Sequence, residues 1–96
     1  METNYRFEEI KKRAYFDALK VTQMTCVEWV EAIELVFFDK TLSFVETLVC
    51  VKLIFLYVRY LNQEISRADA QREVYLTKSI FVNWRDYDHK SKGALC

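Results

Sequence analysis

The chain has 96 residues, which suits a single folded domain. Lysine and arginine together number 14, as do aspartate and glutamate, so no net charge draws the chain towards nucleic acid or an anionic membrane surface. One glycine and no proline argue against a β architecture built on tight turns, and predict helices joined by short polar connections.

The first predicted helix covers residues 4–23. Apolar residues recur at spacings of three and four, and they predict the face that packs on the core: Phe7, Ile10, Ala14, Ala18 and Val21. Tyr5, Phe16 and Leu19 fall on the opposite side of this helix, with Lys12 among them. Because one core cannot reach both sides, we expect these four residues to be exposed and to bind a partner.

The second predicted helix covers residues 26–38 and begins with a capping box, in which Thr25 and Glu28 satisfy each other's backbone amides. Its expected inward stripe contains Cys26, Trp29, Val30, Ile33, Val36 and Phe37. Val27 and Phe38 lie off this stripe, beside a row of glutamates. We therefore expect both to extend the partner-binding surface.

The third predicted helix, residues 44–64, is the apolar element around which the others are organised. It begins with a second capping box, Ser43 with Glu46. Its only clearly polar strip contains Lys52, Arg59 and Gln63. A membrane span is the competing interpretation, but three charges interrupt the run, and each costs roughly 2.5–3.5 kcal/mol near mid-bilayer. We therefore expect a soluble helix that neighbours bury on several sides, with no membrane partner.

The fourth predicted helix covers residues 67–86, after a third cap formed by Ser66 and Asp69. One continuous helix through Ser66 is the alternative. The expected inward stripe contains Ala70, Val74, Thr77, Ile80, Phe81 and Trp84. Residues 1–88 are predicted to form a single domain and residues 89–96 a flexible C-terminal tail. The predicted fold is all-α, a compact antiparallel bundle of about four helices around the 44–64 helix.

The sequence contains no recognisable catalytic, cofactor-binding or metal-binding constellation. His89 is the only histidine and lies in the predicted tail. Asp86 and Asp88 precede it, but helical spacing places these two carboxylates on different faces. We therefore expect no enzyme activity, no metal and no cofactor.

The cysteines and the N-terminal residues bear on the compartment. Cys26, Cys50 and Cys96 are widely spaced, which is typical of reduced thiols, and we expect Cys26 and Cys50 to be small buried hydrophobes. The first ten residues, METNYRFEEI, lack the apolar segment of a signal peptide. The expected location is cytoplasmic.

Aromatic residues make up 16% of the chain, more than one small core can easily bury. This surplus predicts a small non-enzymatic protein-interaction module, a regulator or inhibitor that acts through exposed aromatic helix faces and forms homodimers. The alternative function is a nucleic-acid-binding accessory protein, which would use Lys11, Lys12, Arg13, Arg85, Lys90 and Lys92. The alternative packing is an irregular bundle that buries the aromatic residues lying off the inward stripes.

Overall fold

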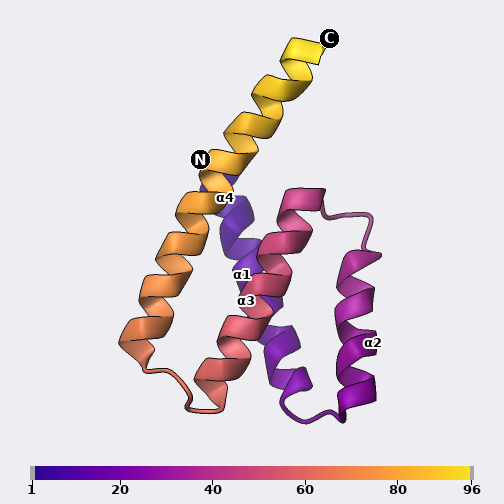
Figure 1. Ribbon diagram of the computed structural model, residues 1–96, viewed down its shortest axis with the longest axis vertical. Helices are drawn as coiled ribbons and strands as arrows, with labels where there is room; N and C mark the ends of the chain where they lie inside the picture. Colours follow the sequence, from indigo (N-terminus) through magenta and orange to yellow (C-terminus); the bar gives the residue numbers. More distant parts are fainter. Residues whose placement is uncertain (1, 96) are drawn as a thin grey trace.

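Four α-helices make up the computed structural model, which describes the backbone of residues 2–95 and the side chains of residues 5–84. The helices are α1 (Glu2–Val21), α2 (Cys26–Phe37), α3 (Phe44–Leu61) and α4 (Arg67–Leu95) (Figure 1). No strand occurs between residues 2 and 95. The prediction of an all-α bundle of four helices is confirmed.

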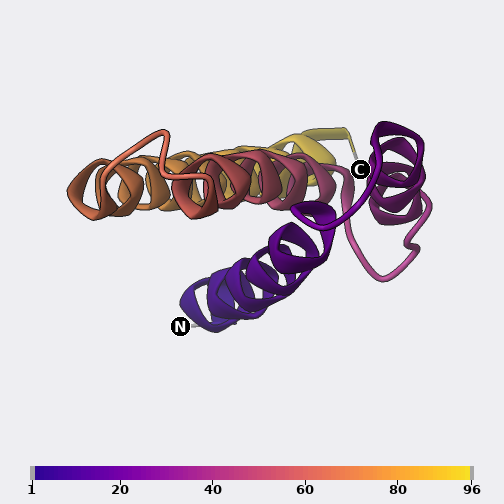
Figure 2. The same cartoon turned by 90° about the horizontal axis from the view of Figure 1, so that it is seen from below.

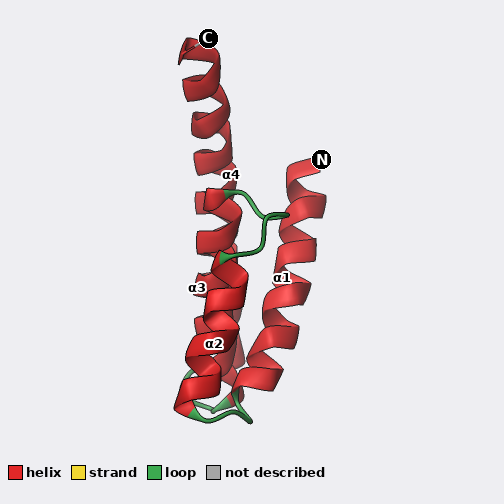
Figure 3. Cartoon of the chain, turned by 90° about the vertical axis from the view of Figure 1, so that its right-hand side faces the viewer, coloured by secondary structure: helices red, strands yellow, loops and turns green. Residues whose placement is uncertain are grey.

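The four helices form two unequal layers. Helices α2, α3 and α4 lie side by side with α3 in the middle, and α1 crosses behind them (Figure 1). Seen from below and from the side, α1 lies on one face of this three-helix layer (Figures 2 and 3). None of the described helices lies on the opposite face. Helix α3 therefore has neighbours on three sides and is open on the fourth.

The core lies between α1 and α3, and it contains the predicted stripe of α1. All five stripe residues are buried: Phe7, Ile10, Ala14, Ala18 and Val21. Phe7, Ile10 and Ala14 pack in one core cluster with buried residues of α3, among them Cys50, Leu53 and Ile54. The rings of Phe7 and Phe81 lie 5.8 Å apart and join α1 to α4. The inward face predicted for α1 is therefore confirmed.

Side-chain caps fix the starts of the other three helices. Both predicted capping boxes are present, Thr25 with Glu28 and Ser43 with Glu46. The hydroxyl of Ser66 accepts a hydrogen bond from the backbone N–H of Asp69 at 3.1 Å. These bonds satisfy amides that a helix N-terminus leaves without partners, so each cap defines where its helix begins.

The alternative of one continuous helix through Ser66 is wrong, because α3 ends in a Schellman motif. The N–H of Glu64 donates to the carbonyl of Arg59 at 2.9 Å, and the N–H of Gln63 to that of Tyr60 at 3.0 Å. Gln63 adopts a φ of 63°, in the left-handed region that favours glycine. This turn reverses the chain into α4.

The predicted end of the fourth helix at residue 86 is also wrong, because α4 continues to Leu95 and extends past the other helices (Figure 1). The segment has no proline, and its only glycine is Gly93, so residues 87–92 contain no stop signal. The side chains of Asp86, Asp88 and His89 lie outside the described residues. Flexibility of residues 89–96 stays a prediction.

Candidate protein-interaction surfaces

The side of α3 that faces away from α1 carries large apolar residues. Glu46 marks the side that faces α1, because its carboxylate binds Arg6 of that helix. At about 100° per residue, an exposed strip lies on the opposite side of α3. This strip contains Phe44, Leu48, Lys52, Phe55 and Arg59.

Helix α2 adds apolar residues beside that strip. Val36 is buried in the core, and the ring of Trp29 lies 4.7 Å from that of Phe55. The direction around α2 from Val36 to Trp29 therefore points towards the strip of α3. At about 100° per residue, the next side chains in that direction are Ile33, Cys26, Phe37 and Val30. Ile33 is half-buried, whereas Phe37 and Val30 are exposed.

Helix α4 borders the strip on its other side. Ala70 and Val74 line a shallow depression together with Lys11 of α1, so this flank of α4 faces α1. Around α4, in the direction from Val74 to Ala70 and beyond, the next exposed apolar side chains are Trp84, Ile80 and Leu76. These three residues therefore lie on the same side of the layer as the strip of α3.

We call this surface the open face and define it by eight exposed residues: Val30, Phe37, Phe44, Leu48, Phe55, Leu76, Ile80 and Trp84. Their exposed fractions range from 43% to 75%. With about 150–250 Å² for each whole aromatic side chain and somewhat less for the aliphatic ones, they expose roughly 800 Å². The largest apolar patch on a typical monomer covers only about 300–600 Å².

The charges around the open face are separated by helix. Lys52 and Arg59 are exposed on α3, and no ion pair involves either of them within the described side chains. Helix α2 has no basic residue, and its three glutamates, Glu28, Glu31 and Glu34, are exposed. The open face therefore has a basic strip along α3 and an acidic helix at one edge.

The predicted partner-binding residues are all exposed, as their helical phase indicated. Four of them, Tyr5, Lys12, Phe16 and Leu19, lie on the side of α1 that faces away from the core. We call them the α1 outer face, which spans about 21 Å along the helix. Val27 and Phe38 lie separately on α2. The irregular packing that would bury these residues is not observed, and partner binding by them stays a prediction.

The inward stripes predicted for α2 and α4 are partly wrong. Cys26, Val30 and Phe37 were expected to pack inward but are exposed, as are Ile80 and Trp84. A helical wheel of the sequence identifies the apolar side of a helix, but the neighbouring helices determine which part of that side is buried. Because only α1 covers the layer, and on one face alone, the rest of each apolar side remains in solvent.

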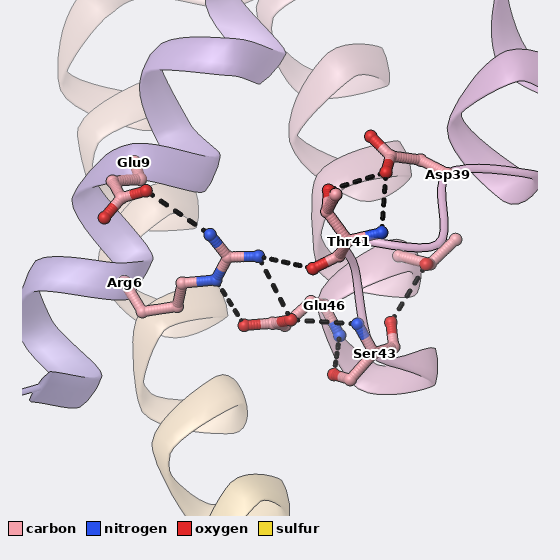
Figure 4. Close-up of polar contacts among 7 residues, drawn as sticks. Arg6, Glu9, Asp39, Thr41, Ser43 and Glu46 are labelled. Carbon is pink, nitrogen blue, oxygen red and sulfur yellow. Dashed lines mark hydrogen bonds and ion pairs between the residues drawn. The ribbon is translucent and has the colours of Figure 1, made fainter.

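Two ion pairs that no sequence pattern indicated hold the α2–α3 connection against α1. Arg6 donates from Nε to Oε2 of Glu46 at 2.6 Å and from Nη2 to the carbonyl of Thr41 at 3.0 Å (Figure 4). Burial raises the pKa of Glu46, but its hydrogen bonds from Arg6 and Ser43 outweigh this effect, so the net pKa is lowered. The carboxylate therefore stays ionised at the N-terminus of α3.

The second pair joins Arg13 of α1 to Asp39, which follows α2. Oδ1 of Asp39 also accepts hydrogen bonds from the hydroxyl and the N–H of Thr41, at 2.6 and 2.8 Å (Figure 4). These bonds from Thr41, followed by the one from Arg13, lower the pKa of Asp39 to about 2. Together the two pairs hold the α2–α3 connection and the start of α3 against α1.

The basic run proposed for nucleic-acid binding is largely neutralised. Lys11 lies 2.9 Å from a carboxylate oxygen of Glu8. Arg13 pairs with Asp39 and lies 3.7 Å from Asp17. The side chains of Arg85, Lys90 and Lys92 lie outside the described residues. The described contacts therefore give the nucleic-acid alternative no support.

Among the described residues, we find no metal-binding cluster and, at Cys50, no activated nucleophilic thiol. No group of three or more histidine, cysteine, aspartate or glutamate side chains among them is placed to hold a metal ion. Burial raises the pKa of the Cys50 thiol to about 11, which disfavours the nucleophilic thiolate. Over the described part of the chain, no helix combines the length and the apolar character that crossing a bilayer requires.

Comparisons with known proteins add no functional assignment. The chain matches no protein-family model, no curated protein and no solved structure. The open face is the larger of the two apolar surfaces that the described side chains form.

Proposed function

We propose that this protein is a small non-enzymatic protein-interaction module, a regulator or inhibitor that acts by covering a surface of another protein. The open face is the single observation that carries the proposal. It combines aromatic residues, which are enriched at binding interfaces, with roughly 800 Å² of exposed apolar surface.

The energy available from covering this face is large enough for stable binding. Burial of roughly 800 Å² at about 25 cal/mol per Å² corresponds to about 20 kcal/mol before costs. Association costs about 4–15 kcal/mol in lost translational and rotational freedom. Because the exposed residues lie on helices, their backbone is already ordered before binding, which lowers the cost of association.

The α1 outer face is a second, smaller surface on the opposite side of the molecule. Tyr5 and Phe16 are its most exposed large residues, at 70% and 66%. Lys12 lies between them and can extend its aliphatic stem over apolar surface while its ammonium group stays in water. The two faces allow one molecule to contact two proteins at once.

The test is affinity capture from an extract of the source organism, quantified by mass spectrometry. The wild type is compared with Leu48→Asp on the open face, with Phe16→Asp on the α1 outer face, and with Leu35→Asp. Leu35 is the matched control because it is 71% exposed and lies outside both faces. Circular dichroism establishes that each variant is folded.

We expect a protein that is captured by the wild type and by Leu35→Asp to be lost with Leu48→Asp. Calorimetry then measures the affinity of the purified partner for the wild type and for each variant. Loss with Phe16→Asp alone would assign partner binding to the α1 outer face. Equal capture by all folded variants would contradict the proposal that these apolar faces bind proteins.

A further inference from the structure

We infer that the occupant of the open face is a second copy of this chain, bound about a two-fold axis with α2 of each copy lying across α3 of the other. The inference rests on the proposed function, because it assigns a partner to the same face: the protein whose capture is lost with Leu48→Asp is then the native copy of this chain. Two observations carry it: the size of the face and the distribution of charge across it.

The size of the open face agrees with what one subunit contributes to a stable dimer. Specific interfaces of standard size bury about 800 Å² on each partner. The eight residues of the open face expose roughly this area. In a two-fold interface both copies use the same patch, so each contributes an equal area. With α2 over α3, the contact covers the open-face residues of these two helices, and Leu76, Ile80 and Trp84 of α4 lie at its margin.

The charges favour a second copy over a neutral apolar partner and also indicate the register. Glu34 follows Val30 by four residues and precedes Phe37 by three, so it lies beside both at the edge of the open face. Lys52 and Arg59 form the basic strip of α3. When two copies of this surface face each other, the acidic edge on α2 of one copy can lie against the basic strip on α3 of the other.

The same charges disfavour the simplest alternative register. If α3 of one copy lay directly on α3 of the other, each Lys52 would approach the other Lys52, because this residue is near the middle of the helix. Like charges brought together in an interface are destabilising. A shift that places α3 over α2 of the second copy instead brings Lys52 towards Glu34. Two-fold symmetry forms this contact twice.

The test measures molecular mass by sedimentation equilibrium from about 1 to 500 µM protein. We expect the wild type to dimerise. Lys52→Glu or Glu34→Lys alone raises the dimer dissociation constant by at least about tenfold, because each change creates two repulsive contacts. The double variant K52E/E34K returns it to within about threefold of the wild type. Lys12→Glu, an equivalent reversal on the α1 outer face, leaves it unchanged.

A second pair of variants separates apolar burial from charge. Leu48→Asp gives a folded monomer, whereas Leu35→Asp remains a dimer. A wild type that is monomeric over the whole range, or a dimer that Leu48→Asp leaves intact, would overturn the inference. So would charge reversals that weaken the dimer without rescue in the double variant, because the α2-over-α3 register would then be wrong.

These outcomes separate the inference from the proposed function. A monomeric wild type that still captures a protein partner through Leu48 overturns self-association and leaves the interaction module standing. A monomer whose capture is unaffected by Leu48→Asp and by Phe16→Asp overturns both.

Discussion

Arg6 and Glu46, forty residues apart in the chain, meet through two hydrogen bonds, from Nε to Oε2 at 2.6 Å and from Nη2 to Oε1 at 3.3 Å. The same Glu46 carboxylate accepts from the N–H of Ser43 at 2.9 Å, so one side chain caps α3 and anchors it to α1. The start of the central helix is therefore also the point where the two layers are joined.

The first prediction concerns this anchor. Arg6→Ala leaves a largely buried carboxylate without its guanidinium partner, and we expect a loss of about 2 kcal/mol in the free energy of unfolding. Glu9→Gln removes only the charge from the more exposed contact with Arg6, at 3.3 Å, and should change stability by less than about 0.5 kcal/mol. Urea denaturation of both variants measures the difference. Equal losses would show that Glu46 does not depend on Arg6.

The second prediction compares the effect of Leu→Ala on stability at a buried position and at an exposed one. Leu53→Ala removes a side chain with 0% exposure from the core and should destabilise by about 2–5 kcal/mol. Leu35→Ala truncates a side chain that is 71% exposed and should cost less than about 1 kcal/mol. Thermal and urea unfolding provide the measurement. A large loss at Leu35 would mean that α2 packs on the bundle by a different side.

The third prediction concerns pH. The pKa of Asp39 is lowered to about 2 in the folded protein, against an ordinary value of 3.8. A carboxyl group with a lowered folded-state pKa stabilises the fold above its unfolded-state pKa, and this contribution is lost as pH falls towards about 2. We therefore expect Asp39→Asn to be less stable than the wild type at pH 6. The difference should shrink steadily between pH 5 and pH 2.

Denaturant titrations of the two proteins at matched pH values test this expectation. The asparagine retains an oxygen that accepts from Thr41, so the comparison isolates the charge. A stability difference that does not vary between pH 6 and pH 2 would show that Asp39 has an ordinary pKa.

The fourth prediction concerns the turn between α3 and α4. Gln63 adopts a positive φ of 63°, which is unfavourable for a residue with a Cβ atom. Glycine relieves this strain but gains more freedom in the unfolded chain, so we expect Gln63→Gly to stabilise by about 0.5–1 kcal/mol. Gln71→Gly, inside α4, should instead destabilise by a similar amount. A higher melting temperature for Gln63→Gly alone would support the turn geometry.

The sequence was sufficient to predict the local features of the fold. The stripe from Phe7 to Val21 depends on residues that recur every three or four positions. The caps at Thr25, Ser43 and Ser66 each depend on two residues three positions apart. Such spacings are visible in the chain itself. The same periodicity predicted that Tyr5 and Phe16 are exposed, because both lie on the side of α1 opposite the buried stripe.

Features that depend on the arrangement of helices could not be predicted. The contact of Arg6 with Glu46 joins distant segments, and neither residue signals the other. Helix α3 was expected to be buried on several sides, yet its Phe55 is 43% exposed because no described helix covers that side. The open face arises from the placement of α1 on one side of the layer, which no single helix determines.

The burial of Cys50 makes the reaction rate of its thiol a measure of how often α1 separates from α3. This thiol is fully buried on the side of α3 that faces α1, and the Cys26 side chain is exposed. If Cys26 and Cys96 are replaced by serine, the one remaining thiol can be labelled only when the two layers part. Its rate of modification by an uncharged reagent then reports how often the core opens to solvent, without unfolding the whole molecule.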